Sequence, residues 1–390
     1  MIPQRELAAL RAEWSLSQDV IEKDYILGWL LAGIAHHEAL NQTWVFKGGT
    51  CLRKCYYETY RFSEDLDFTV RNGGPEDPND LVPIFTGVSA WIREESGIEL
   101  VIDDNVFRRR QNRRGNATTQ ARIAYRGPNA NNAMPKVKLD LTSDEVIADR
   151  PTMRPIGHPY SDSLPGGSVL CYSIEELFGE KLRALAERGR PRDLYDVVHM
   201  HRHPDLIGYA PAVRSVLSAK CQHAGIEVPT QESIQSSPHR EELQAEWANM
   251  LGHQLPQPLV PFDTFWSELG SVFTWLDGAG VTSPLPRAEI GEVSDWVAPS
   301  AMASWRLGVP MELLRYAGAN RLRVEIDYRA EQGRHGPRIV EPYSLRRTLD
   351  GNLLLFVVND RGVLRGYRVD RIAGIRPTTE PFTPRFRVEF

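Results

Sequence analysis

The sequence predicts an α+β protein, in which a compact α/β sheet core with flanking helices is followed by a small C-terminal β barrel. Residues 44–141 alternate short β-prone runs with helical segments, which is typical of a sheet domain. Residues 200–280 carry apolar and aromatic side chains at helical spacing. From Arg321 onward, β-prone runs separated by Gly, Asn and Asp recur about every ten residues, which predicts a barrel or sandwich.

The first clear helix is expected to begin after Ser17, which can cap it, and to run through Leu31. The core is then expected to contain strands at residues 43–46, 67–70, 98–102, 120–125 and 137–141, with helices after Thr50 and over residues 81–94.

Proline, glycine and serine mark the expected joints of the chain. We expect a connecting loop over residues 151–167. A long helix is expected to begin after Ser173, which can cap it, and to end at Gly189, after which a second helix begins. We therefore expect N-terminal helices and core over residues 1–150, a helical part of the same domain over 151–285, a linker over 286–309 and the barrel over 310–390.

Composition limits the function classes. With 42% hydrophobic and 25% charged residues among 390, the chain is expected to fold as a globular protein of two or three domains. It has no apolar run of about 20 residues and does not begin like a signal peptide, so we expect a cytoplasmic protein without a membrane partner. The four cysteines form no Cys-x-x-Cys pair, and Cys51 and Cys55 are expected to be core residues on one helix face.

The charge is uneven. Residues 321–390 hold 14 Arg, no Lys and 9 acidic residues, a net +5 that leaves −10 for residues 1–320. Arginine binds phosphate bidentately, so this tail is consistent with an anionic partner. A solvated surface of paired charges is an equally good interpretation.

A candidate nucleotide site begins after the short strand expected over residues 43–46, which is followed by Lys47. Gly48 and Gly49 form a turn without Cβ atoms, Thr50 opens a helix, and such a turn presents free backbone N–H groups to a phosphate. Asp65 and Asp67 then alternate with large apolar residues, which places both carboxylates on one strand face about 7 Å apart. Two Mg2+ ions bridged by carboxylates and phosphates would satisfy that arrangement.

Each half of this pattern has an ordinary interpretation. A Gly-Gly pair is usually a turn, and an Asp-x-Asp pair is usually a solvated strand edge. Together, and with apolar neighbours that bury the strand, they favour a catalytic site, because unpaired buried carboxylates are costly.

A third carboxylate lies on a strictly alternating strand. Lys136, Lys138 and Asp140 share one face of it. If this strand neighbours that of Asp65 and Asp67, Asp140 can accept the proton of an attacking hydroxyl. A half-buried strand without chemistry is the alternative.

Lys181 lies among apolar residues of its predicted helix, so its ammonium needs a partner. A triphosphate would serve, and so would a salt bridge to Asp193 or Asp196.

Residues 108–114 contain five arginines. We expect a charged loop between two strands, in which Arg109, Arg110, Arg113 and Arg114 contact the backbone of an RNA or DNA substrate. A solvated hairpin tip is the alternative.

Several separated motifs then resemble one family. They are residues 21–25, 46–50, 61–67, 138–140, 175–185 and 192–196. In this order they are similar to the AbiEii/AbiGii nucleotidyltransferase toxins of the DNA polymerase β-like superfamily. The resemblance, over residues 17–280, implies a polymerase β-like core and an enzyme of toxin–antitoxin or phage-defence systems. Such an enzyme binds NTP with Mg2+ or Mn2+ and transfers a nucleotidyl group, in some members to the 3′ end of tRNA.

The resemblance also implies roles for individual residues. Asp65 and Asp67 would be metal ligands, and Asp140 the third catalytic carboxylate. The nucleotide would be bound by the turn Lys47, Gly48, Gly49 and Thr50 together with Lys181 and Asp193. An antitoxin protein would be a partner.

The tail from Pro310 resembles a WYL domain, an Sm/SH3-like barrel thought to bind nucleotides or nucleic acid. The aromatic triplet that names that domain is replaced here by Leu353-Leu354-Leu355-Phe356. Arg368 and Arg371 are the residues expected to keep a ligand role. The alternative is that they form ion pairs with Asp370 and with acidic loop residues.

Two functions follow. The first is a metal-dependent nucleotidyltransferase toxin that acts on an RNA acceptor. The second is a regulatory protein that senses a nucleotide or nucleic acid through its WYL-like domain, although no helix-turn-helix stands out upstream of that domain.

Overall fold

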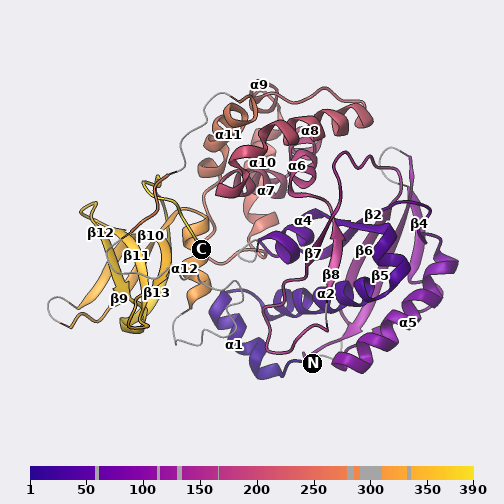
Figure 1. The fold of residues 1–390 in the computed structure, drawn as a ribbon, viewed down its shortest axis with the longest axis horizontal. Helices are drawn as coiled ribbons and strands as arrows, with labels where there is room; N and C mark the ends of the chain where they lie inside the picture. Colours follow the sequence, from indigo (N-terminus) through magenta and orange to yellow (C-terminus); the bar gives the residue numbers. More distant parts are fainter. Residues whose placement is uncertain are drawn as a thin grey trace. The chain divides into compact units, whose positions relative to one another are not determined.

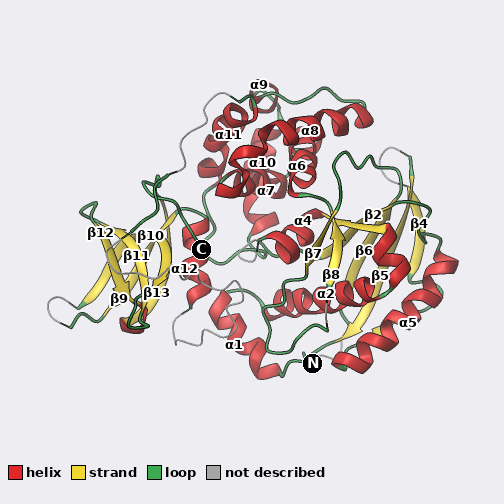
Figure 2. Ribbon diagram, in the orientation of Figure 1, coloured by secondary structure: helices red, strands yellow, loops and turns green. Residues whose placement is uncertain are grey.

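The computed structural model describes residues 1–57, 61–111, 115–129, 134–165, 167–278, 285–289, 310–331 and 335–390. They form two compact units. The first comprises residues 1–9, 17–187 and 212–229, and the second comprises residues 10–16, 188–211 and 230–390. Figure 1 labels their elements, and Figure 2 separates helices from strands.

A mixed eight-stranded sheet forms the centre of the first unit. Its strands are β1 (Trp44–Lys47), β2 (Asp65–Val70), β3 (Glu99–Val101), β4 (Phe107–Gln111), β5 (Ala117–Arg126), β6 (Lys136–Thr142), β7 (Thr152–Pro155) and β8 (Ser168–Cys171). The order is β3-β5-β6-β2-β1-β8-β7, and β4 also pairs with β5. The pairs β2–β6 and β1–β8 are parallel. The alternation of buried and partly exposed residues on β5 and β6 gives the sheet one apolar and one polar face.

The helices of this region are α1 (Gln4–Trp14), α2 (Gln18–His36), α3 (Glu38–Thr43), α4 (Gly48–Cys51), α5 (Pro78–Ser96), α6 (Ile174–Arg188) and α8 (Ala210–Ala224), with a π-helical turn η1 (Leu52–Tyr56) after α4. Ser17 caps α2, as expected, by accepting a hydrogen bond from the Val20 N–H.

Two long helices cover the apolar face of the sheet, as Figure 1 shows for α2 and α5. The Phe85 ring of α5 lies 6.0 Å from that of Trp44 and 4.9 Å from that of Phe107, so this helix reaches from β1 to β4. Gly33 of α2 has no room for a Cβ, which would lie 2.8 Å from Ile92 of α5. Burial of this face leaves the other face of the sheet to carry the polar residues.

The second unit contains α7 (Pro191–His201), η2 (Pro204–Tyr209), α9 (Gln231–Gln235), α10 (His239–Leu251), α11 (Phe262–Leu276), α12 (Met311–Ala319) and η4 (Val369–Arg371). Its strands are β9 (Leu322–Tyr328), β10 (Gly336–Arg347), β11 (Leu353–Asn359), β12 (Leu364–Arg368) and β13 (Ile372–Pro381). Aromatic stacking joins α7 to α11, where the rings of Tyr195 and Phe265 lie 5.0 Å apart. The predicted helices of residues 200–280 and the predicted α+β class are confirmed.

The C-terminal strands form an open antiparallel sheet in the order β12-β11-β10-β9-β13, and the predicted barrel is not confirmed. The β-prone runs were correctly predicted to be strands. They carry no information on whether the two edge strands meet, because closure depends on twist and stagger over the whole sheet.

Two predicted loops contain strands. The arginine run was expected to be a loop, but Phe107–Gln111 is strand β4, an edge strand with four exposed side chains. An edge strand tolerates such charges because its side chains reach solvent while its backbone pairs with β5. The region 151–167 was also expected to be a loop, but Thr152–Pro155 forms β7 at the opposite edge. Arg113, Arg114 and residues 290–309 of the expected linker lie outside the described residues.

Candidate active site on the polar face of the sheet

Strand register brings the three predicted carboxylates side by side. The parallel pairing of β2 with β6 places Asp65 opposite Lys138 and Asp67 opposite Asp140. The Lys138 ammonium forms an ion pair with Asp140. The condition set for Asp140, a strand next to that of Asp65 and Asp67, is therefore met.

The electrostatics of this group are unfavourable without a further cation. Burial, together with the neighbouring Asp140 and Asp65, raises the pKa of Asp67 to about 6. The Oδ1 atom of Asp140 is buried and has no hydrogen-bond partner among the described residues. Carboxylate oxygens are the ligands that Mg2+ prefers, and a divalent cation here would both satisfy that oxygen and lower the cost of ionising Asp67. The residues present therefore fit such an ion.

Gly48 is required at the turn that follows β1. Its φ of +81° lies in the left-handed region, and a Cβ there would lie 2.5 Å from Oδ2 of Asp67. A Cβ on Gly49 would lie 2.6 Å from the guanidinium of Arg61. The two glycines therefore let the turn approach the carboxylate strand and leave the N–H groups of the first helical turn for a ligand.

Thr50 follows the two glycines, and its predicted role in binding phosphate stays a prediction. Its hydroxyl donates a hydrogen bond of 2.5 Å to the Asp65 carbonyl oxygen. The hydroxyl thus joins α4 to the start of β2 and holds the turn beside the carboxylates.

Lys47 lies opposite Asp67 in the β1–β2 register and forms an ion pair with Glu145, a residue that was not predicted. Burial opposes its charge, but Glu145 and Glu180 together raise the pKa of Lys47. Glu145 also accepts a hydrogen bond of 3.2 Å from the Tyr172 hydroxyl. Lys47 therefore stays protonated beside the site.

A second buried lysine lies on the same side. Lys220 of α8 is 5% exposed and lies 2.6 Å from Glu176 and 3.3 Å from Glu180. Although burial opposes the negative charge, Lys47 and Lys220 hold the pKa of Glu180 below its usual value. Lys181, the next residue on α6, is buried as predicted, with 8% exposure.

Lys220 could have been found from the sequence. Val213, Val216, Leu217 and Cys221 form the buried stripe of α8, and a lysine inside such a stripe requires a buried carboxylate partner. Glu145 gave no signal, because it lies in an irregular segment without periodicity.

Asp193 lies in the second unit, at the start of α7. It is fully buried, and both carboxylate oxygens accept hydrogen bonds from the Arg188 guanidinium, at 2.7 and 2.8 Å. Its predicted role in the nucleotide pocket stays a prediction.

The motif at residues 21–25 contacts the helix that follows the Gly48 turn. Asp24 is buried and accepts hydrogen bonds from Arg53 at 2.8 Å, from Lys54 at 2.6 Å and from Tyr160 at 2.7 Å. Because Arg53 and Lys54 belong to the π-helical turn, this carboxylate fixes the helix that follows Gly48.

The polar face continues from the carboxylates into a basic groove of about 520 Å³. Register places Gln120 opposite Asp140 and Arg108 opposite Gln120, so these residues form one cross-strand row. The groove is lined by Arg108, Arg110, Gln120, Arg122 and Lys136, together with residues of the β3–β4 segment.

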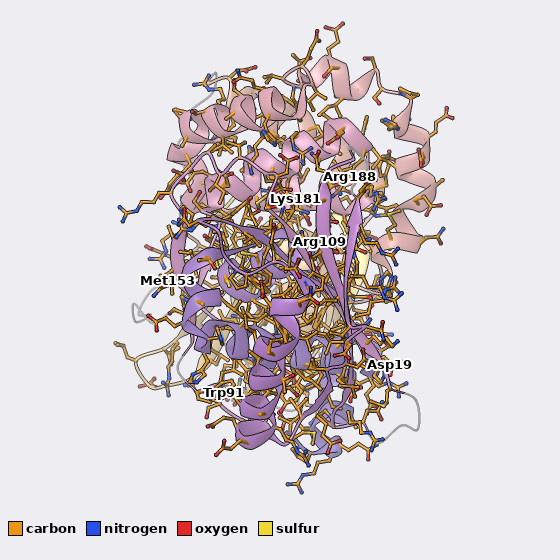
Figure 3. All side chains as sticks on the ribbon, turned by 90° about the vertical axis from the view of Figure 1, so that its right-hand side faces the viewer. Asp19, Trp91, Arg109, Met153, Lys181 and Arg188 are labelled. Atoms are coloured by element: carbon orange, nitrogen blue, oxygen red, sulfur yellow. The ribbon has the colours of Figure 1, made fainter. Side chains whose placement is uncertain are left out.

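Of the predicted arginines, Arg110 lines this groove, whereas Arg109 does not. Arg109, labelled in Figure 3, lies one residue out of phase on β4 and reaches Glu76 and Asp77 at 3.6 and 3.9 Å. Arg108 was not selected from the sequence, because the side-chain alternation of a strand was not recognised in a segment expected to be a loop.

In the C-terminal sheet, both predicted arginines have acidic partners. Arg368 forms a 2.6 Å ion pair with Asp370, and Arg371 forms one with Glu331. These are the contacts expected of the alternative interpretation, and a ligand role for the two arginines stays a prediction.

Comparison with known proteins places the chain among known families and folds. The family model of the nucleotidyl transferase AbiEii toxin of type IV toxin–antitoxin systems matches residues 29–268, and that of the WYL domain matches residues 311–377. Among solved structures, the chain resembles MenT4, a nucleotidyltransferase toxin of Mycobacterium tuberculosis H37Rv, with a TM-score of 0.53 and 18% identity over 71% of this chain and 90% of that one. At this identity the likeness shows the fold alone. No curated protein sequence matches the chain.

Proposed function

Because the chain belongs to the AbiEii family of nucleotidyltransferase toxins, we propose that it transfers a nucleotidyl group from an NTP to an RNA acceptor, with the help of a divalent metal ion. The observation that carries this proposal is the cross-strand row in which Asp67 and Asp140 lie opposite each other beside the Gly48 turn.

The residues of the candidate site have separate tasks in this reaction. Asp65 and Asp67 hold Mg2+ or Mn2+, an ion that would neutralise phosphate charge when bound. The N–H groups of Gly48 and Gly49, with Lys47 and the buried Lys181, hold the triphosphate. Positioning and charge neutralisation supply most of the rate enhancement in such reactions.

The chemical step is an in-line substitution. An acceptor hydroxyl attacks the α-phosphorus, a new oxygen–phosphorus bond forms, the bond to the β-phosphate oxygen breaks, and pyrophosphate leaves. Asp140 takes the proton of the hydroxyl. The place of Asp140 directly opposite Asp67 in the strand register supports this role.

The basic groove supports a nucleic-acid acceptor. It lies on the same sheet face as the carboxylates, two to three strands away, which is about 10–15 Å at the usual strand spacing. Four of its side chains are cationic, namely Arg108, Arg110, Arg122 and Lys136, against one carboxylate, Asp103. An RNA 3′ end, such as that of a tRNA, bound there would present its terminal hydroxyl to Asp140.

We place this activity in a type IV toxin–antitoxin or phage-defence system, where an antitoxin restrains the enzyme. The structure has no helix among its described residues that is long and apolar enough to cross a membrane.

The test incubates the protein with each α-labelled NTP and total RNA, with Mg2+, with Mn2+ or with EDTA. Matched RNA whose 3′ hydroxyl has been destroyed by periodate is the control. We expect label on intact RNA with a divalent ion, and none with EDTA or on oxidised RNA. Equal labelling of oxidised RNA, or labelling only of protein, would refute the proposed acceptor.

A further inference from the structure

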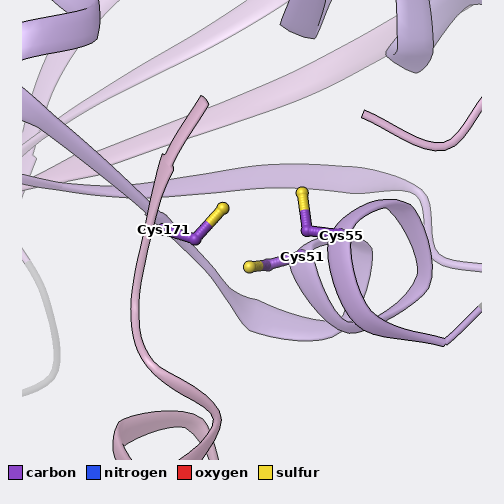
Figure 4. A group of neighbouring side chains, drawn as sticks. All are labelled: Cys51, Cys55 and Cys171. Atoms are coloured by element: carbon purple, nitrogen blue, oxygen red, sulfur yellow. The ribbon is translucent and has the colours of Figure 1, made fainter. Parts of the chain in front are cut away.

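Three buried thiols meet behind the turn of the candidate active site (Figure 4). Cys51 ends α4, Cys55 belongs to the π-helical turn η1, and Cys171 ends β8. Their sulfur atoms all lie within 4.8 Å of one another. None of the three residues is more than 6% exposed.

The three cysteines lie on the backbone segments that flank the Gly48 turn. β8 runs parallel to β1 with Cys171 paired to Phe46, the residue before Lys47. Cys51 and Cys55 lie four residues apart on one side of the helix that Gly48 begins. The helix widens there, since the Tyr57 N–H donates to the Leu52 carbonyl at 2.7 Å, and π-helical turns are frequent at functional sites.

The sulfur positions suit a soft metal ion. With zinc–sulfur bonds of about 2.3 Å, the ligands of one ion lie roughly 4 Å apart. Sulfur atoms already within 4.8 Å reach that spacing by less than about 1 Å of side-chain adjustment. Thiolate ligands select Zn2+ and Cu+ over hard ions such as Mg2+, so the cluster would not compete for the ion of the carboxylate site.

The surroundings can balance the charge of bound thiolates. The Arg154 guanidinium donates to the Cys55 carbonyl at 3.1 Å and lies 4.6 Å from the centre of the Tyr56 ring. Three thiolates around Zn2+ carry one net negative charge, which a neighbouring guanidinium offsets.

We propose that Cys51, Cys55 and Cys171 bind one thiophilic metal ion, Zn2+ or Cu+, which joins α4 to β8 and holds the Gly48 turn in place. On binding, each thiol gives its proton to solvent and forms one metal–sulfur bond, without any change of oxidation state. The site is independent of the nucleotidyl-transfer proposal and can fail without affecting it.

The test measures metal on the full-length chain. Protein purified under reducing conditions is analysed for bound metals, then stripped with a chelator and titrated separately with Zn2+, Cu+ and the spectroscopic probe Cd2+, whose thiolate charge-transfer absorption counts the sulfur ligands. We expect about one ion per chain and a rise in Tm of about 5 °C on refilling. Zinc in the purified protein identifies Zn2+ as the occupant, and uptake of Cu+ alone identifies Cu+.

Serine variants assign the ligands. Cys55→Ser and Cys171→Ser should lose the charge-transfer band and the Tm shift. Cys221→Ser is the matched control, because Cys221 is equally buried but lies on α8 outside the cluster. The proposal is overturned if the unmodified chain takes up none of the three ions in stoichiometric amount, a result that needs no variant to fold. It is also overturned if Cys55→Ser and Cys171→Ser bind as much metal as Cys221→Ser.

Discussion

Replacing Gly48 by alanine is expected to damage catalysis far more than stability. The added Cβ would lie 2.5 Å from Asp67 Oδ2, whereas ordinary contact begins at 3.4 Å. The carboxylate, the turn or both must therefore move by about 0.9 Å, and misplacement of about 1 Å can reduce an enzyme's rate roughly 100-fold. The left-handed φ adds a cost of about 1–2 kcal/mol to folding for any residue with a Cβ.

A second glycine separates these two effects. Gly225 has a similar φ of +67° but nothing within 4 Å of its missing Cβ. Gly225→Ala should therefore lose about 1–2 kcal/mol of unfolding free energy with unchanged transfer rates, whereas Gly48→Ala should lose a similar amount and about 100-fold in rate.

The assay compares initial rates of nucleotidyl transfer with urea unfolding curves for the three proteins. If Gly48→Ala transfers nucleotide within about threefold of Gly225→Ala at equal stability, the contact between the turn and Asp67 does not control catalysis.

Three other outcomes are expected. Asp67→Asn should stabilise the metal-free protein, because a pKa raised to about 6 means that the ionised carboxylate opposes folding. The gain should be small near pH 4 and grow to at most about 3 kcal/mol above pH 6, and a gain that shrinks with rising pH would contradict the assignment. Arg108→Ala should weaken RNA binding about 3- to 10-fold and lower its salt dependence, whereas Arg109→Ala should not, which a salt titration of binding will decide. Glu268→Gln should cost about 1–3 kcal/mol in urea unfolding because it leaves two arginines without their carboxylate partner, whereas the exposed Glu331→Gln should cost less than about 1 kcal/mol.

The sequence predicted those parts of the fold in which one face is buried. β6 alternates strictly, so its polar face and the position of Asp140 on that face followed from the sequence, whereas its pairing with β2 became known only from the structure. β4 was missed because an edge strand with four exposed side chains has no apolar alternation. The open C-terminal sheet was missed because closure depends on the twist and stagger of the whole sheet, which turn residues do not encode.

The sequence predicted those parts of the candidate site whose residues lie close together in the chain. The Gly48 turn and the Asp65–Asp67 pair are short patterns with a physical reason for their spacing. Glu145 and Lys220 come from distant segments and join the site only through tertiary contacts with Lys47 and Glu180. The Cys51–Cys55 pair was correctly placed on one helix face, but its meeting with Cys171 depends on the β1–β8 pairing.

The most direct test of the central claim measures nucleotidyl transfer to RNA by Asp65→Asn and Asp67→Asn. Asp80→Asn is the matched control, because Asp80 is an exposed carboxylate on α5, against the opposite face of the sheet. If the row on the polar face is the catalytic centre, both variants of β2 lose transfer by at least about 1,000-fold in the presence of Mg2+ while they remain folded, and Asp80→Asn stays at the unmodified rate. Transfer that survives in folded Asp65→Asn and Asp67→Asn would contradict the account.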